Sequence, residues 1–183
     1  MTFPELETSR LRLVEIKEDH IQSYFEIMSN DDLTKYYGMD SLKKLEQAES
    51  IIASMQRTYK SKRGIRWGIV LKETGEFSGT VGLNNLNLPA KRAEIGYELK
   101  PSLWGKGITS EAVGEVLHYS FDHLDLFRMG TVTFPQNIPS IKLLKKAGFT
   151  EEGRLRGYLY QNNQSHDAVV FSLLRTEIKN ALQ

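Results

Sequence analysis

The chain has 183 residues, of which 40% are hydrophobic and 26% charged, a composition typical of one globular domain spanning residues 1–183. Its 24 basic and 23 acidic residues nearly cancel, and no leader or apolar run of about 20 residues is present, so we expect a cytoplasmic protein that binds neither nucleic acid nor membrane. The absence of cysteine excludes disulfides, cysteine–zinc sites and a cysteine nucleophile.

The first third of the chain predicts one strand and two helices. Residues 11–14 are typical of a strand, and apolar residues at helical spacing then predict a short helix over residues 21–28. A second apolar stripe, from Leu42 to Tyr59, predicts a longer helix. The polar segment between the helices carries Tyr36 and Tyr37, and aromatic side chains in such loops often line substrate sites.

The remaining elements alternate between strands and helices. A turn at residues 73–76 predicts a hairpin of strands 67–71 and 79–86, followed by a strand over residues 93–99 and a helix ending near Leu124. Residues 128–134 predict a strand, Asn137 is expected to cap a short helix that ends at Gly148, and two strands over residues 149–160 and 166–174 follow. Residues 175–182 are expected to form a terminal helical turn.

The segment from Ala93 to Leu124 carries the clearest chemical signal. It reads as a strand, a loop with Gly105 and Gly107 on either side of Lys106, and a helix. Such a loop gathers main-chain N–H groups at the positive end of a helix dipole, which holds a phosphate without a metal ion. The same pattern also fits a tight turn between two packed elements.

Two common phosphate-binding motifs do not fit this loop. A P-loop requires serine or threonine after Gly-Lys, but Gly107 follows Lys106. A dinucleotide fingerprint requires a third glycine or alanine where Ser110 stands, and an acidic residue at the end of the next strand, which is absent.

Six short motifs, spread over most of the chain, together indicate a family. They are Thr8-Ser9-Arg10-Leu11-Arg12-Leu13, Glu94-Ile95-Gly96-Tyr97, Trp104-Gly105-Lys106-Gly107, Asn137-Ile138-Pro139-Ser140, Ala147-Gly148-Phe149 and Glu152-Gly153-Arg154. Together they resemble the GNAT superfamily of N-acetyltransferases and, more narrowly, its ribosomal-protein N-terminal (Rim-class) branch. The resemblance implies an α/β domain of the α+β type. In it, a mixed, mostly antiparallel sheet is flanked by helices, and a splayed parallel strand pair holds the cofactor.

The resemblance also implies acetyl-CoA as the donor, without a metal. The expected cofactor residues are Leu99, Trp104, Gly105, Lys106, Gly107, Ile108, Thr109, Asn137 and Ser140. The diphosphate would bind the main-chain N–H groups of residues 105–109, and the pantetheine amides would bind the main chain around Leu99. Thr109 stands where the family commonly has glycine or alanine, and we expect it to be tolerated because its hydroxyl can cap the helix.

The expected chemistry is direct transfer, with no covalent acyl-enzyme. Glu94 is the first candidate for a general base, followed by Glu152 and Glu98, although Glu94 also fits a solvated strand carboxylate. Ser140 is expected near the sulfur, and proton donation by Ser140 is a separate hypothesis, since a serine in a first helical turn is also ordinary capping chemistry. Tyr36, Tyr37 and Glu152 are expected to contact the acceptor.

Three functions compete at this point. The first is acetylation of the N-terminal α-amino group of a protein, and the resemblance implies a ribosomal one. The second replaces this acceptor by a small amine, such as an aminoglycoside, a polyamine or an amino acid. The third is a catalytically silent acyl-CoA-binding module. Acidic and basic residues in the presumed acceptor regions are balanced, which leans toward a peptide, and the sequence leaves open whether the protein forms a homo-oligomer.

Overall fold

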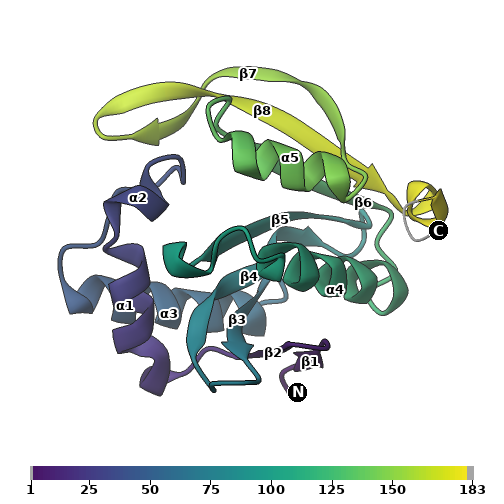
Figure 1. Cartoon of the computed structure of the whole chain (residues 1–183). Coiled ribbons are helices and arrows are strands. Elements are labelled where there is room, and N and C mark those ends of the chain that lie inside the picture. Colours follow the sequence, from purple (N-terminus) through teal and green to yellow (C-terminus); the bar gives the residue numbers. More distant parts are fainter. Residues whose placement is uncertain (1, 181–183) are drawn as a thin grey trace.

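The computed structural model describes residues 2–180, which form one α/β domain built on an eight-stranded sheet of order β1-β2-β3-β4-β5-β6-β8-β7 (Figure 1). The strands are β1 (Leu6–Glu7), β2 (Leu11–Glu15), β3 (Ile65–Leu71), β4 (Phe77–Asn87), β5 (Arg92–Leu99), β6 (Arg128–Thr133), β7 (Thr150–Gln161) and β8 (Gln164–Leu174). The helices are α1 (Ile21–Met28), α2 (Asp31–Thr34), α3 (Leu45–Lys60), α4 (Ile108–Asp122) and α5 (Ile138–Lys146). Short 3-10 helices lie at Glu18–His20, Pro101–Leu103 and Arg175–Asn180.

This architecture confirms the predicted fold class, since all strand pairs are antiparallel except β5 with β6. The sequence reading missed β1 and α2, which are only two and four residues long. The predicted terminal turn is the 3-10 helix Arg175–Asn180, and its last two predicted positions lie outside the described residues. Within residues 2–180, every helix is too short or too polar to traverse a lipid bilayer.

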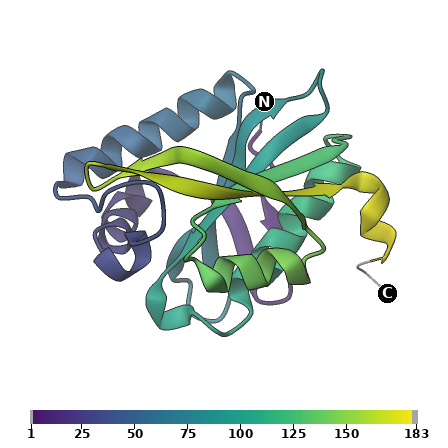
Figure 2. The ribbon, with the colours of Figure 1, turned by 90° about the horizontal axis from the view of Figure 1, so that it is seen from above.

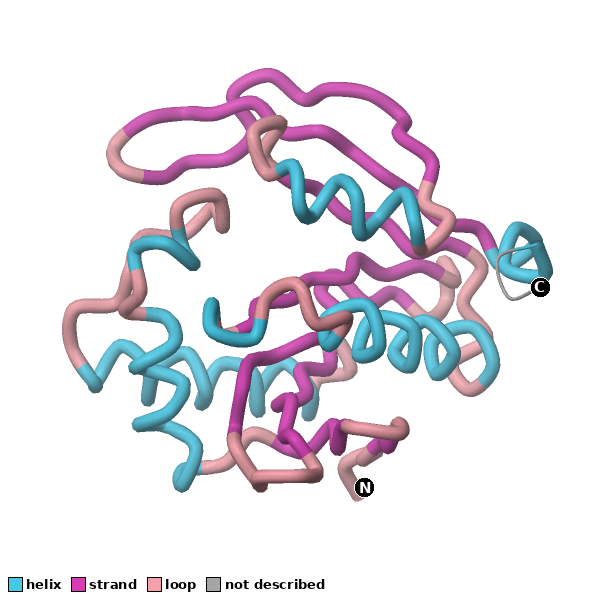
Figure 3. The backbone as a smooth tube through the Cα atoms, in the orientation of Figure 1, coloured by secondary structure: helices cyan, strands magenta, loops and turns pink. Residues whose placement is uncertain are grey.

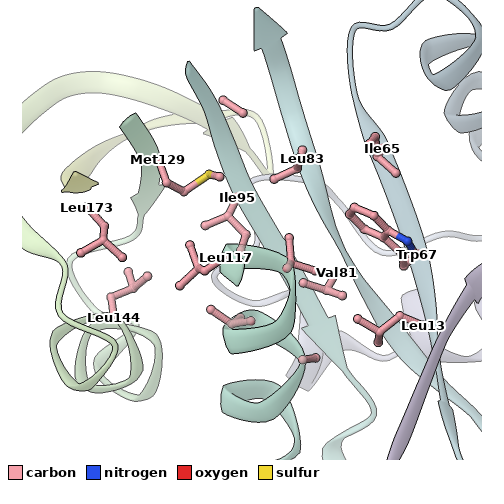
Figure 4. Packing of buried hydrophobic residues seen from close by; sticks show 14 of the residues in the cluster. Leu13, Ile65, Trp67, Val81, Leu83, Ile95, Leu117, Met129, Leu144 and Leu173 are labelled. Carbon is pink, nitrogen blue, oxygen red and sulfur yellow. The ribbon is translucent and has the colours of Figure 1, made fainter. Parts of the chain in front are cut away.

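Two apolar clusters hold the sheet between layers of helices. Figure 2 shows α3 and α5 on opposite sides of the β7–β8 hairpin. The larger cluster packs sheet side chains such as Trp67, Val81 and Ile95 against Leu117 of α4 and Leu144 of α5 (Figure 4). The smaller cluster packs α1 and α3 against the other face of the sheet, mainly through Ile16, Tyr24, Met28, Ile52 and Phe77. The central strands are therefore covered on both faces, which explains the nearly continuous burial of β4.

The parallel pair β5–β6 opens after three residue pairs. The last pair is Glu94 with Gly130, beyond which β6 pairs only with β8. The Ile95 carbonyl still accepts a hydrogen bond from Thr131 Oγ1 at 2.9 Å, so this edge of β5 faces β6. Every second residue of a strand directs its N–H and C=O groups to the same edge. The peptide groups of Tyr97 and Leu99 therefore point, like that of Ile95, toward β6 and into the opening. The Leu99 carbonyl is already bound by Trp104 Nε1 at 2.7 Å.

Two loops from distant parts of the sequence close one side of this opening. The segment that follows α2 reaches the turn of the β7–β8 hairpin (Figure 3). There the buried side chain of Gln161 accepts from Gly38 N–H at 2.9 Å and donates to the Thr34 carbonyl at 2.7 Å. The Asn162 N–H also donates to Asp40 Oδ1 at 2.8 Å. These bonds fix the segment that carries Tyr36 and Tyr37.

Candidate active site

Three cavities meet along the opened edge of β5. The loop cavity, about 630 Å³, runs from Gly105, Gly107 and Thr109 to Asn137 and Ser140. The central cavity, about 300 Å³, lies between Glu94 and the same Ser140, and shares five lining residues with the loop cavity: Tyr36, Tyr37, Tyr97, Asn137 and Ser140. The outer cavity, about 1060 Å³, shares Asn84, Glu94, Thr131 and Val132 with the central cavity. The three spaces therefore adjoin one another across the sheet.

The glycine loop presents main-chain donors to the loop cavity. Gly105 and Gly107 both have a φ of +74°, a left-handed conformation that glycine adopts without steric cost. The first main-chain bond of α4 runs from Glu111 N–H to the Gly107 carbonyl at 3.1 Å. Among residues 2–180, no acceptor is found for the N–H groups of residues 105–110. These groups point from a helix N-terminus and fit a diphosphate.

Arg10 and Glu111 brace this loop, a role that the sequence reading missed. Arg10 Nε donates to Glu111 Oε2 at 2.6 Å, and Arg10 Nη1 donates to the Lys106 carbonyl at 2.9 Å. Burial raises the pKa of Glu111, but hydrogen bonds from Thr8 and from the main chain and side chain of Arg10 outweigh it and lower the pKa to about 2. The positive charge of the Arg10 guanidinium thus compensates the negative charge of Glu111 in the first turn of α4. This carboxylate would otherwise repel the diphosphate expected nearby.

The other loop residues contribute in different ways. The side chain of Ile108 is buried in the core and so leaves only its main chain for binding. The exposed Lys106 lines none of the three cavities, and the predicted contribution of its charge stays a prediction. Trp104 is half exposed and lines the loop cavity, while its indole N–H fixes the loop to Leu99. At the pantetheine site expected around Leu99, the N–H of Leu99 is therefore available to bind the cofactor, whereas its carbonyl is occupied by Trp104.

Ser140 lies where the loop and central cavities meet, beside a residue that the sequence reading assigned only to the strand. The Tyr97 hydroxyl is 2.7 Å from Ser140 Oγ, and burial raises the pKa of Tyr97 to about 12 although the Ser140 hydrogen bond lowers it. Asn137 Oδ1 accepts from Ser140 N–H at 3.3 Å, so Asn137 caps α5 and also lines both cavities. A tyrosine among aliphatic residues of a strand was the available signal, because a buried hydroxyl needs a partner.

Glu94 lies at the junction of the central and outer cavities. Its Oε2 accepts from Asn85 Nδ2 at 3.1 Å. Its side chain lies beside Gly130 of β6, where an added Cβ would make ordinary van der Waals contact with Glu94 Cγ at 3.6 Å. Glu94 and Ser140 thus both line the central cavity, from opposite sides of the opening.

Tyr37 and Glu98 form a polar cluster in the wall of the loop cavity, and Tyr37 also lines the central cavity. Glu98 accepts hydrogen bonds from the hydroxyls of Tyr37 and Thr80, and Arg66 Nη1 lies 4.0 Å from its Oε2. Burial and the Glu98 charge raise the pKa of Tyr37 well above its usual value. Glu98 therefore holds the α2–α3 segment to β5, and both of its carboxylate oxygens already accept a hydrogen bond within the protein. The ring of Tyr36 packs against Phe134 with centroids 5.9 Å apart and lines both cavities.

The structure does not bring Glu152 to these residues. Its two carboxylate oxygens each accept from Arg128 at 2.7 Å, and Ser172 Oγ donates to Oε1 at 2.6 Å. These hydrogen bonds, led by those of Arg128, lower the pKa of Glu152 to about 2. Glu152 lines none of the three cavities.

Known acetyltransferases resemble this chain in both sequence and fold. The family model described as "Acetyltransferase (GNAT) domain" matches residues 10–150. An uncharacterized N-acetyltransferase of Bacillus subtilis, YoaA, is 44% identical over 94% of this chain and 98% of its own length. The putative ribosomal N-acetyltransferase YdaF of the same organism is 36% identical over 70% of this chain and 69% of its own. Spermidine N-acetyltransferase from Vibrio cholerae, solved with CoA and spermine, is 20% identical and has a TM-score of 0.82 over 94% of this chain and 100% of its own.

Proposed function

Because the chain belongs to the GNAT acetyltransferase family and is an acyltransferase of this kind, we propose that it transfers the acetyl group of acetyl-CoA to the N-terminal α-amino group of a protein. A ribosomal protein is the acceptor that the name of YdaF suggests, and the cytoplasm is the location expected for such a substrate. One observation carries the proposal. A cavity that begins at the unpaired N–H groups of the glycine loop ends at Ser140, where a second cavity leads to Glu94.

The loop cavity offers main-chain donors that suit the diphosphate and the amide groups of CoA. The N–H groups of residues 105–109 would hold the diphosphate, and the peptide groups of Tyr97 with the Leu99 N–H would hold the pantetheine amides. When bound, acetyl-CoA supplies a thioester, an activated acetyl group. The neighbour solved with CoA has the same fold, which supports this assignment.

The acceptor amine must be neutral to react, and its pKa decides how much help it needs. An α-amino group with a pKa of about 7.7–8.0 costs only about 1 kcal/mol to deprotonate at pH 7. A lysine side chain with a pKa of about 10.4 costs nearly 5 kcal/mol. A carboxylate acting through water suffices for the α-amino group, and we assign this role to Glu94, which lines the central cavity with Ser140.

Ser140 and Tyr97 would serve the leaving group. A hydrogen bond donated by Tyr97 to Ser140 Oγ leaves the Ser140 hydroxyl proton free to point toward the sulfur. Tyr97 retains its own proton at neutral pH because burial raises its pKa. A thiol with a pKa of about 8.5 leaves as a moderately stable anion, so this hydrogen bond stabilises charge rather than supplying an obligatory proton.

The experiment that tests this function measures CoA release from acetyl-CoA with several classes of amine. The panel holds short peptides with free N-termini, the same peptides with blocked N-termini and one lysine, spermidine, and free amino acids. We expect release with the free α-amino peptides. Release with spermidine or amino acids alone would contradict the proposed acceptor. Stabilisation by acetyl-CoA without release on any amine would instead identify a silent binding module.

A further inference from the structure

The outer cavity carries a charge pattern that the proposed reaction does not use. We propose that it binds acidic residues that directly follow the acetylated residue of the acceptor, through Arg57, Arg63 and Arg92. This inference rests on the proposed peptide acceptor and narrows it to proteins with an acidic N-terminal segment.

Arginines from three parts of the fold line this cavity. Arg57 lies near the end of α3, Arg63 follows that helix, and Arg92 and Arg128 begin β5 and β6. Arg92 and Arg128 are register partners in the parallel pair, and the Leu86 N–H donates to the Arg63 carbonyl at 3.0 Å, which fixes the segment after α3. Sheet pairing and this loop bond therefore gather the four cations.

Three of these arginines are available to a ligand. Arg128 is bound to Glu152 at 2.7 Å. Arg57, Arg63 and Arg92 are exposed, and among residues 2–180 no carboxylate oxygen lies within 4.0 Å of their guanidinium nitrogens. Glu94 is the one carboxylate among the residues that line the cavity, and it lies at the inner end.

The outer cavity has room for several residues of a peptide. Its volume of about 1060 Å³ lies at the upper end of the usual range of ligand sites, about 300–1,000 Å³. It shares Asn84, Glu94, Thr131 and Val132 with the central cavity. Between Asn84 and Asn87 the β4–β5 ladder is interrupted, and Asn85 has a φ of +49°, so amide side chains and irregular backbone line the path. An extended peptide with its amine at Glu94 would run outward past the arginines.

The charge of the path selects the acceptor. Cations along a concave surface attract carboxylates and repel a polyamine, whose second and third charges would lie among the arginines. The amine of the peptide would lie at Glu94 and its following residues would lie beside the arginines. This change from negative to positive charge along the cavity also sets the direction in which the peptide binds. Exposed pairs of this kind are each worth about 0.2–1 kcal/mol, which corresponds to about a 1.4- to fivefold change in binding.

The test compares three matched peptides that share one first residue and carry glutamate, glutamine or lysine at the next three positions. We expect the glutamate peptide to have a kcat/KM about tenfold above that of the glutamine peptide, mainly through KM, and the lysine peptide to be poorest. The triple variant Arg57→Gln, Arg63→Gln, Arg92→Gln should remove the preference. The control Arg12→Gln, on β2 and lining none of the three cavities, should retain it. Raising the salt concentration should shrink the preference in the wild type.

The outcomes separate this inference from the function on which it rests. Equal acetylation of all three peptides would overturn the acidic-segment assignment and leave the peptide acceptor standing. Acetylation of spermidine with no peptide acetylated would overturn the peptide acceptor itself. Inhibition by a single-stranded RNA oligomer that the triple variant relieves, without any peptide preference, would assign the cavity to nucleic acid and overturn the inference.

Discussion

The Tyr97 hydroxyl lies 2.7 Å from Ser140 Oγ, which joins the opened edge of β5 to the first turn of α5. Both residues line the loop cavity and the central cavity. The point where the strands part is therefore also the point where the expected thioester and the acceptor amine would meet. This relationship places a hydroxyl pair, and not an isolated serine, at the candidate reaction centre.

Replacing Ser140 should affect the chemical step more than donor binding. We expect Ser140→Ala to lower kcat about 10- to 100-fold while the Kd for acetyl-CoA changes little, because the hydroxyl interacts with the leaving sulfur and not with the diphosphate. Steady-state kinetics and calorimetric titration with acetyl-CoA measure the two effects. An equal loss of binding and rate would assign Ser140 to scaffolding.

Tyr97→Phe tests whether the two hydroxyls act as one unit. If Tyr97 acts by orienting Ser140, the double variant with Ser140→Ala should lose no more kcat than Ser140→Ala alone. Additive losses in this double-mutant cycle would show that Tyr97 has an independent role.

Gly107→Val should abolish acetyl-CoA binding. Gly107 has a φ of +74°, where a β-branched residue is strained, and an added Cβ would lie 3.5 Å from Arg10 Nη2, so the substitution distorts both the turn that presents the N–H groups and the arginine that braces it. Gly75→Val is the matched control, because Gly75 has a φ of +71° in the β3–β4 turn, with nothing within 4 Å of an added Cβ. The control should lose stability but keep donor affinity. Equal loss of affinity in both variants would contradict a specific role for the loop.

Local patterns were enough to predict the elements that build the donor site. Gly105 and Gly107 between a strand and an apolar-periodic helix indicated an anion loop, and Asn137 before Pro139 indicated the capped helix that positions Ser140. Both signals are local because positive φ and capping depend on residues only a few positions apart.

Contacts between residues far apart in the chain could not be predicted from the sequence. Arg10 and Glu111 are 101 residues apart, and neither shows its partner in the sequence. Tyr37 lines both cavities as a residue expected to contact the acceptor, but the sequence did not show that its hydroxyl would be bound to the buried carboxylate of Glu98, a candidate base. Glu152 matched a family motif, yet the pairing of β7 with β8 places it against Arg128. Such roles depend on which charges tertiary packing brings together.

The brace between Arg10 and Glu111 predicts a specific acid sensitivity. The pKa of Glu111 is lowered from 4.5 to about 2, so its contribution to folding is complete above pH 4.5 and is lost as the pH falls toward 2. Because Arg10 is half exposed, solvent screening reduces this loss to about 1–2 kcal/mol of the free energy of unfolding. Urea denaturation across this range should show a shallower pH dependence for Glu111→Gln than for the wild type. Glu46→Gln, in the first turn of α3, is the control and should keep the steeper wild-type dependence.

Tyr37→Phe should reduce stability because it removes one donor from the buried Glu98 carboxylate. We expect the free energy of unfolding to fall by about 1–3 kcal/mol, the usual cost of an unsatisfied buried polar group. Tyr36→Phe is the matched control, since its ring packs against Phe134 and should change stability by less than about 0.5 kcal/mol. Equal effects of the two substitutions on urea denaturation would contradict the cluster around Glu98.

A crystal structure of the protein grown with acetyl-CoA tests the central claim most directly. We predict that diphosphate oxygens accept hydrogen bonds from main-chain N–H groups of residues 105–109 and that the sulfur lies beside Ser140 Oγ, with the acetyl group facing Glu94 across the opening between β5 and β6. A ligand bound elsewhere, or a glycine loop whose N–H groups turn away from the diphosphate, would contradict the assignment of the donor site and the reaction built on it.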